Sequence, residues 1–455
     1  MLRRFTLKAL VAAAVVALAA PIATAASAET VAIVNARILT AGSAGEIANG
    51  TIVIRDGTIA AVGANVPTPA GARVIDARGG VVTPGFFATG SQLGAVEVGA
   101  LGNDLGVRNP DVSAAFDVQY GLNPLSPLIP VARWGGITRA IVMPEAQGGG
   151  DGHKDDAGTT ADFAGSGPDS ITHALFAGQA AVIHLGAGVD ILVRPKVGMV
   201  VPFGRAGARI AGGARGAEIV ALKALLQDVR DYARNRDAVR RGGYREMSLS
   251  IADLEALVPV VEGRMPIIAE VSRAADILAL LKLAREENLK VIIRGGEEAW
   301  MVADQIAAAR VPVLLYPLSN LPSSFERINA TMENAARLER AGVLVAFETA
   351  EGGAHRARET RYDAGNAVAH GMSYEGALKA ITINPARIFG VGDRVGSLEV
   401  GKEADVVLWS GDPFEPLSQP LAVFIQGRQQ PMEARNLELR DRYRDLNGAY
   451  PLGYK

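Results

Sequence analysis

A repeated alternation of short apolar strands and amphipathic helices in the second half of the chain constrains the fold most. Residues 265–272, MPIIAEVS, predict a buried strand, and residues 273–288 predict a helix that Ser272 is placed to cap. Three more pairs follow, with strands over 290–295, 311–319 and 343–349 and helices over 297–310, 325–342 and 358–371. Four such units in succession predict a parallel sheet with helical crossovers. A chain of 455 residues is long enough for a complete (β/α)8 barrel and a smaller domain.

The preceding part of the chain is less regular. Residues 137–145 and 179–186 predict strands, and residues 217–241 predict a long amphipathic helix with a charged outer face. Residues 145–170 are rich in glycine and aspartate. This composition favours disorder over the alternative, a mobile lid.

Both ends of the chain carry a different, β-rich pattern. Residues 31–39 predict one strand, and residues 51–63 predict a hairpin that turns at Asp56-Gly57. Residues 395–411 and 421–428 again predict short strands with glycine turns. Since neither end is large enough to bury a core alone, we expect the two ends to pair into one domain.

The fold class predicted is therefore α/β, a (β/α)8 TIM-type barrel plus a small composite β-sandwich domain formed from both ends of the chain. The predicted organisation is a signal peptide over 1–28, β-sandwich parts over 29–84 and 391–430, the barrel over 85–390 and a C-terminal tail over 431–455.

The first 28 residues have the pattern of an export signal. Arg3, Arg4 and Lys8 precede an apolar run, and small residues stand ahead of Glu29. The alternative is a membrane anchor, but the apolar run is short for a spanning helix. We therefore expect cleavage and export to the periplasm, by the general route or by the twin-arginine route that the "RRFTLK" segment partly matches.

Composition excludes several classes of function. There is no cysteine, so disulfides, thiolate nucleophiles and cysteine-ligated metals are excluded. The formal net charge is −2, and no basic patch is evident. We therefore expect no nucleic-acid partner, and no membrane partner once the signal is cleaved.

No two of the 5 histidines have a spacing typical of a metal site. His184 ends an apolar strand and His370 ends a helix, and both are predicted to be structural. His153 and His173 lie in or beside the polar loop. His355 follows the last predicted strand, so it could lie over the barrel mouth.

Three motifs resemble the amidohydrolase superfamily, near its imidazolonepropionase-like and dipeptidase-like members. They are VTPGFFATGSQLG over 82–94, the segment 254–277 that leads into the fifth strand, and ALKAITINPARIFGVGDRVGSLEVGKEADVVLWSGDP over 377–413. The resemblance implies a barrel with a composite β domain and hydrolysis of a C–N bond in a cyclic amide, ureido group or small dipeptide. It also implies one or two divalent metals at the barrel mouth, which activate water.

The resemblance places the family's ligands on residues that mostly cannot bind a metal. The His-x-His pair of the first strand falls on Gly90 and Gln92, and the aspartate before it on Ala88. The histidines of the fifth strand fall on Glu270 and Ser272. Of these five residues, only the carboxylate of Glu270 is an acceptable zinc ligand.

The remaining positions give the same result. Gly295 stands where the sixth strand has histidine, and Ala350 where the eighth has the catalytic aspartate, although Glu348 is two residues away on the same face. The bridging lysine stays unassigned, with Lys196 and His184 as candidates. We expect no cofactor, and zinc or another divalent metal only if an unrecognised ligand set exists.

Two hypotheses follow. The chain is either a hydrolase with a non-standard site, or a non-catalytic relative that binds a small ligand or pairs with an active paralogue; a homo-oligomer is also possible. A carboxylate such as Glu270 is costly to bury alone, so we expect it to be solvated or paired with an arginine such as Arg294, and structural pairing is favoured over catalysis. The barrel-mouth candidates are Gln92, Glu270, Ser272, Arg294, Glu348 and His355.

Overall fold

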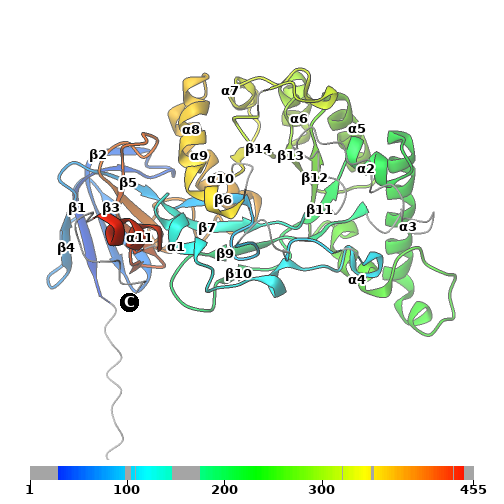
Figure 1. Cartoon of the computed structure of the whole chain (residues 1–455), viewed down its shortest axis with the longest axis horizontal. Coiled ribbons are helices and arrows are strands. Elements are labelled where there is room, and N and C mark those ends of the chain that lie inside the picture. The colour runs from blue at the N-terminus through cyan, green and yellow to red at the C-terminus, as the bar shows by residue number, and fades with distance from the viewer. Residues whose placement is uncertain are drawn as a thin grey trace, which may run out of the picture.

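The computed structural model describes residues 29–97, 104–107, 109–145, 175–319, 321–349, 353–433 and 435–444. In Figure 1, a β-rich part that contains β1, β2 and α11 lies beside a larger part in which helices surround strands. The predicted signal peptide lies outside the described residues, as does most of the glycine-rich loop. Within the described ranges, no helix is both long enough and apolar enough to cross a membrane.

Strands from both ends of the chain share one sheet of 8 strands, in the order β18-β17-β16-β5-β1-β2-β3 with β4 paired to β1. The two ends meet where β16 pairs with β5 in antiparallel fashion. Side chains from both ends, Ile33 and Phe424 among them, form one buried cluster. The predicted hairpin turn is present, with φ angles of 51° at Asp56 and 78° at Gly57. The strands are β1 (Val31–Leu39), β2 (Glu46–Arg55), β3 (Thr58–Gly63), β4 (Arg73–Asp76), β5 (Val81–Pro84), β16 (Val406–Trp409), β17 (Pro420–Ile425) and β18 (Arg428–Gln429).

The four predicted strand–helix units are present, and their strands pair in parallel in chain order. Three of the helices are shorter than predicted, because 3-10 turns stand ahead of them: η4 (Ala299–Val302), η5 (Phe325–Arg327) and η6 (Ala354–Glu359). The strands are β12 (Ile267–Val271), β13 (Val291–Gly295), β14 (Val313–Leu315) and β15 (Val345–Phe347), and the helices are α5 (Ala274–Glu286), α6 (Ala303–Ala309), α7 (Asn334–Arg340) and α8 (Thr360–Ala369).

The remaining strands complete two sheets, in the orders β10-β9-β7-β6 and β15-β14-β13-β12-β11-β8. A parallel bridge between Thr89 and Glu348 connects β6 to the end of β15. On the other side, β8 and β9 are separated only by Ala180, whose backbone bonds to Gly198 and Val197 beside β11. The pairings thus run from strand to strand around a ring. The strands are β6 (Phe86–Ser91), β7 (Ile137–Val142), β8 (Gly178–Gln179), β9 (Ala181–His184), β10 (Leu192–Arg194) and β11 (Met199–Pro202).

One strand of this ring departs from the predicted all-parallel arrangement. β9 pairs antiparallel with β7, and β8 pairs antiparallel with β11. The chain passes from β9 to β11 through the short strand β10, which forms a hairpin with β9, and not through a helix. Parallel neighbours need a long crossover, so this short connection reverses the strand direction.

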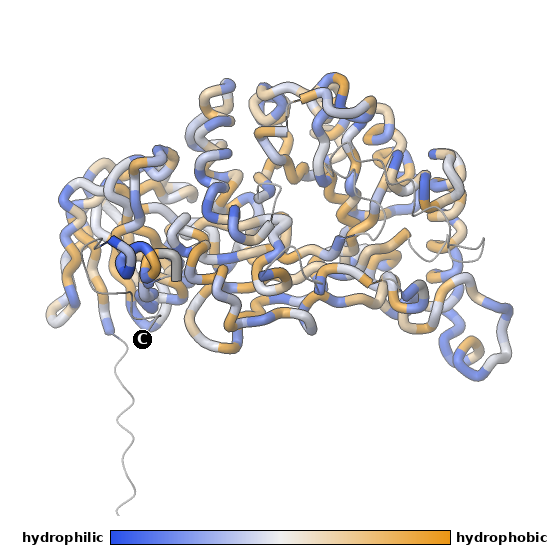
Figure 2. The backbone as a smooth tube through the Cα atoms, in the orientation of Figure 1, coloured by the Kyte–Doolittle hydropathy of each residue, from blue (hydrophilic) through white to orange (hydrophobic). Residues whose placement is uncertain are grey.

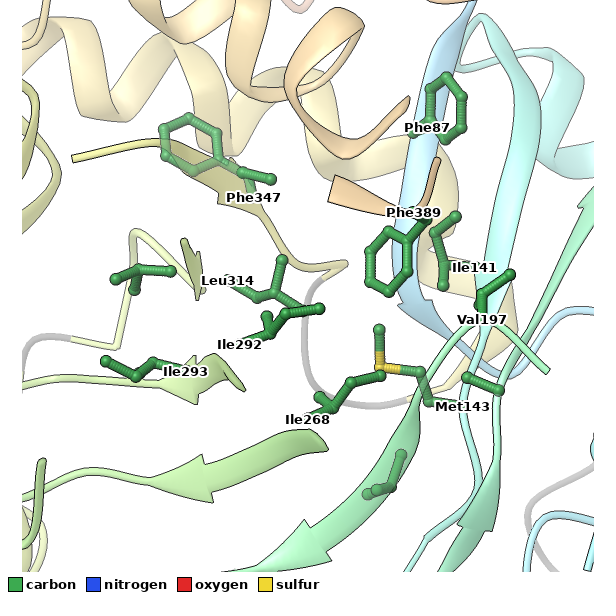
Figure 3. Close-up of a cluster of buried hydrophobic side chains, with 14 of the residues drawn as sticks. Phe87, Ile141, Met143, Val197, Ile268, Ile292, Ile293, Leu314, Phe347 and Phe389 are labelled. Atoms are coloured by element: carbon green, nitrogen blue, oxygen red, sulfur yellow. The ribbon is translucent and has the colours of Figure 1, made fainter. Parts of the chain in front are cut away.

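The space between the strands is filled by apolar side chains. Figure 3 shows Ile268 and Ile292 from β12 and β13 with Met143, Phe347 and Phe389, all of them buried. Because these side chains pack closely, the interior of the ring is an apolar core. Polar side chains that could form a site are therefore expected at the carboxyl ends of the strands.

Helices cover the outside of the ring. The predicted helix over 217–241 is present as the longest, and Figure 2 shows its C-terminal part as mainly hydrophilic. The helices not yet given are α1 (Leu128–Arg133), α2 (Arg205–Ile210), α3 (Arg215–Arg240), α4 (Ile251–Val261), α9 (Tyr374–Ala380) and α10 (Ile383–Ile388). The last helix, α11 (Arg435–Arg444), lies with the β-rich part.

Candidate functional site

Three of the predicted candidates meet at the carboxyl ends of β12, β13 and β15. Glu270 and Arg294 lie opposite each other in the parallel pairing of β12 with β13. Glu348 directly follows β15, where its backbone bridges to Thr89 of β6. Strand register therefore brings the three side chains to the same end of the ring, at its mouth.

Arg294 binds both carboxylates. Its Nε donates to Oε1 of Glu348 at 2.6 Å, and its Nη1 donates to Oε1 of Glu270. The side chains of Arg294 and Glu348 are 18% and 12% exposed, so this pair is largely removed from water. The expected pairing of Glu270 with Arg294 is thus present, with Glu348 as a second partner.

The charges at the mouth shift the pKa values of this group. Burial alone would lower the pKa of Arg294, but the carboxylates of Glu348 and Glu270 outweigh burial and raise it. Arg294 therefore stays protonated. Burial raises the pKa of Glu348, and the charges of Glu270 and Glu297 add to that shift, so Arg294 compensates it only in part.

The side chain of Glu348 lies where a side chain on Gly90 would begin. A Cβ atom built on Gly90 would be 2.5 Å from Oε1 of Glu348 and 3.4 Å from Nη2 of Arg294. The φ angle of Gly90 is +66°, in the left-handed region that other residues rarely adopt. The ion pair and a longer residue at position 90 therefore compete for the same space.

Gln92 and His355 lie at a second part of the mouth. Nε2 of Gln92 donates to Oε1 of Glu145 at 2.6 Å. A Cβ atom on Gly353 would be 3.3 Å from Nδ1 of His355 and 3.5 Å from Oε1 of Gln92, so these two side chains flank Gly353. His355 is exposed on η6. Glu145 also raises the pKa of Arg294 through its charge, which links the two parts of the mouth.

Ser272 does not have the predicted role of helix cap. Helix α5 begins one residue later than expected, with Arg273 at the N-cap position. The backbone N–H of Ala274 donates instead to Oε2 of Glu298 at 3.0 Å. Glu298 thus supplies the acceptor from the next loop, and its Oε1 accepts from the backbone N–H and the side-chain amide of Asn329 at 3.1 Å each.

Sequence reasoning missed Glu297. The sequence predicted a helix that begins at Glu297, but Glu297 and Glu298 are both buried ahead of η4. Oε1 of Glu297 accepts from Ser319 and lies 3.2 Å from Nε of Arg327. The signal available in the sequence was the position of Glu297, two residues after the carboxyl end of β13.

Two histidines have the predicted structural roles. His184 is buried, with Nε2 2.7 Å from the carbonyl oxygen of Asp190 and Nδ1 accepting from the N–H of Gly186. His370 ends α8, where its Nδ1 lies 2.8 Å from the carbonyl oxygen of Asn366. Lys196 is exposed, 4.0 Å from Asp117. His153, His173 and Ala350 lie outside the described residues.

A separate pocket of about 390 Å³ is lined by α2 and the segment that follows β14. Its lining includes Arg205, Arg209, Phe325 and Glu326, and none of the predicted candidates. Glu326 is bound by Arg215 at 2.6 Å, so its charge is compensated. The predicted candidates thus form their own group at the mouth.

The metal expected from the resemblance does not fit the residues that the structure describes. Glu270 and Glu348 both face the guanidinium of Arg294, and Gly90 and Gly295 have no side chain. Among the described residues, no group of three or more His, Cys, Asp or Glu side chains could hold a metal ion. A catalytic zinc site needs three protein ligands.

Comparison with known proteins identifies relatives over most of the chain. Residues 266–432 match the model of the amidohydrolase family. The amidohydrolase tasK of Hapsidospora irregularis is 23% identical over 410 residues, which cover 84% of this chain. The match covers 40% of that protein, so this chain spans about two fifths of its curated relative.

Solved structures share the fold. An amidohydrolase from Thermotoga maritima MSB8 is 26% identical, with a TM-score of 0.74 over 88% of this chain and 99% of that one. Molinate hydrolase is 17% identical, with a TM-score of 0.50 over 89% of this chain and 95% of its own, a similarity of fold alone. The family match over residues 266–432 and the fold shared with the Thermotoga maritima amidohydrolase show that this chain is similar to amidohydrolases.

Proposed function

We propose that this protein is an exported amidohydrolase-superfamily member that binds a small ligand at its barrel mouth and has lost hydrolysis by a metal-activated water. The proposal includes the complete scaffold expected from the sequence, a TIM-type barrel with a composite β domain. By resemblance to the family, the inherited activity is hydrolysis of a C–N bond.

One observation carries the proposal: Arg294 engages the carboxylates of both Glu270 and Glu348. In the family, a metal ion supplies positive charge at the mouth and lowers the pKa of bound water. A guanidinium supplies positive charge but cannot coordinate water, and it repels a metal cation. The glycine at position 90 supports the same reading, because Glu348 lies against it.

A second candidate is a hydrolase that works without a metal. The raised pKa of Glu348 favours it, because a carboxyl group that binds its proton more tightly can act as a general acid or base. Gln92 and His355 would then bind substrate. Pairing with an active paralogue, or with a second copy of this chain, is a further proposal.

The experiment that tests the proposal is elemental analysis of the purified mature protein after exposure to zinc and to manganese. It is combined with assays on a dipeptide, a cyclic amide and a ureido substrate, with and without a chelator. We expect metal well below one ion per chain and no chelator-sensitive hydrolysis. One ion per chain would overturn the proposal, and chelator-resistant hydrolysis would favour the second candidate.

A matched variant tests the assigned positions. Gly90→His combined with Gln92→His restores the family's first-strand pair, but we expect no metal-dependent hydrolysis. Glu348 obstructs position 90, and Gly295 remains without a side chain. Robust metal-dependent activity in this variant would show that the other ligands lie elsewhere in the chain.

A further inference from the structure

We propose that the ligand of the mouth carries a cationic amine, which binds beside Gly295 between the carboxylate of Glu297 and the backbone carbonyl of Val271. This inference rests on the proposed ligand-binding function and names the chemical class of the ligand.

The first argument is the incomplete hydrogen bonding of Glu297. Its side chain is 5% exposed. Oε1 accepts from Ser319 at 3.2 Å, whereas Oε2 is buried and has no hydrogen-bond partner within the described residues. Buried carboxylate oxygens are costly without a donor, so each one calls for an explanation. Oε2 is therefore an acceptor that suits a donor from outside the chain.

The second argument is the geometry at Gly295. The point where a Cβ atom would lie on this residue is 3.3 Å from Oε2 of Glu297 and 3.4 Å from the carbonyl oxygen of Val271. Gly295 is partly exposed, so this point is near solvent. The carbonyl of Val271 already accepts from the N–H of Gly296, but a carbonyl oxygen has two lone pairs. A ligand nitrogen cannot occupy this point, which is one bond length from Cα of Gly295, but the missing side chain leaves room for a nitrogen to approach both acceptors from farther out.

The third argument is the charge of the mouth. Four carboxylates lie there, those of Glu145, Glu270, Glu297 and Glu348. Two guanidinium groups oppose them, since Arg294 binds Glu270 and Glu348 while Arg327 lies beside Glu297. The field therefore favours a positive ligand.

The acceptor set suits an ammonium group better than a metal ion. An ammonium group has three N–H donors and no acceptor, and it needs acceptors at hydrogen-bond distance. Magnesium and calcium need six or more oxygen ligands much closer to the ion, and catalytic zinc needs three protein ligands. The charged carboxylate and the carbonyl beside Gly295 meet the requirement of an ammonium group, and they are too few for a metal ion.

The test compares benzylamine with benzyl alcohol by calorimetry on the full mature chain. The two probes have nearly the same shape, and only benzylamine carries a positive charge at neutral pH. We expect benzylamine to bind at least about tenfold more tightly, because hydrogen bonds to charged groups are among the stronger ones. Glu297→Gln should remove this preference, because the amide keeps the shape of the side chain without its charge.

Glu298→Gln is the matched control. Glu298 is the neighbouring buried glutamate, and both of its oxygens already accept hydrogen bonds within the protein. This variant should lose stability and keep the preference for benzylamine. If the Glu297 variant does not fold, displacement of benzylamine from the unchanged protein by butylamine, and not by butanol, is the alternative measurement.

The outcomes separate the two proposals. Equal binding of both probes, no binding of benzylamine, or an unchanged preference in the Glu297 variant would overturn the amine inference and leave the non-metal function standing. One zinc ion per chain that excludes benzylamine would instead overturn the proposed function itself.

Discussion

Arg139 and Arg294 each hold two carboxylates, yet in contrasting surroundings. Arg139 on β7 is fully buried, with Nε 2.6 Å from Asp405 and Nη2 2.6 Å from Glu403. Glu403 and Asp405 both lie just before β16, so this cluster connects the C-terminal β segment to the ring of strands. Arg294 instead lies at the mouth, where its cluster is partly open to solvent.

The difference between the two clusters is their charge balance. Glu403 also accepts from Nε of Arg394 at 2.7 Å, so two carboxylates near Arg139 face two guanidinium groups. Burial would raise the pKa of Glu403, but the arginines, Arg139 foremost, lower it overall. The pKa of Glu348 is raised instead, because burial and additional carboxylates prevail. In the Arg139 cluster the carboxylates are matched by guanidinium groups, as in a structural contact. In the Arg294 cluster carboxylates outnumber guanidinium groups, as is typical of a binding site.

The largest effect that tests this comparison is the loss of the Arg139 side chain. Arg139→Met leaves Asp405 and Glu403 without their buried partner, and we expect it to lower the free energy of unfolding by about 3–5 kcal/mol. Arg294→Met should cost less, about 1–3 kcal/mol, because one of the two carboxylates it leaves behind, Glu270, is 31% exposed. Urea denaturation of both variants provides the measurement.

Arg37→Met is the control for these variants. Arg37 forms an exposed ion pair with Glu46, with side chains 42% and 48% exposed, and its loss should cost at most about 1 kcal/mol. Equal losses of unfolding free energy in the Arg139 and Arg294 variants would contradict the distinction between a buried structural cluster and a partly exposed one.

The opposite pKa shifts of Glu403 and Glu348 predict opposite pH dependences of stability. The pKa of Glu403 is lower when folded than its ordinary value of 4.5, so its contribution is present above pH 4.5 and is lost as the pH falls through the folded value. The pKa of Glu348 is higher when folded, so its contribution is present below pH 4.5 and is lost as the pH rises through the folded value.

Glutamine variants separate the two contributions. The stability difference between the unchanged protein and Glu403→Gln should shrink as the pH falls, whereas the difference for Glu348→Gln should shrink as the pH rises. Denaturation midpoints at a series of pH values from about 3 to 8 provide the test. Slopes of the same sign would mean that the two clusters are electrostatically alike.

Local patterns in the sequence were enough to predict the strand–helix units, the turn at Asp56-Gly57 and the pairing of Glu270 with Arg294. The last of these needs only neighbouring parallel strands, since both residues stand at corresponding positions near the strand ends. Sequence reasoning could not predict the reversed strand or the contact between Glu348 and Gly90. Both depend on how distant segments meet when the ring closes, and no local period encodes that.

The segment 296–298 shows the same limit on a smaller scale. Serine before an amphipathic run is a good cap signal, so Ser272 was the natural choice. The acceptor for α5 comes instead from Glu298, 24 residues along the chain from Ala274. A tertiary contact therefore supplies the helix cap that the local signal predicted from Ser272. As a result, the adjacent residues Glu297 and Glu298 differ in their hydrogen bonding. Glu298 has both oxygens bonded, whereas Glu297 has one.

The smallest predicted effects test this last difference. Glu298→Gln should lower the free energy of unfolding by about 1 kcal/mol, as the loss of a helix cap does, because Oε2 no longer offers a charged acceptor to Ala274. Ser272→Ala should change it by less than about 0.5 kcal/mol, because Ser272 does not cap α5. Thermal unfolding of both variants distinguishes the two assignments. A larger loss from Ser272→Ala would show that Ser272 caps α5. It would then contradict the contrast in which Glu298 has a structural role and its neighbour Glu297 is free to bind a ligand.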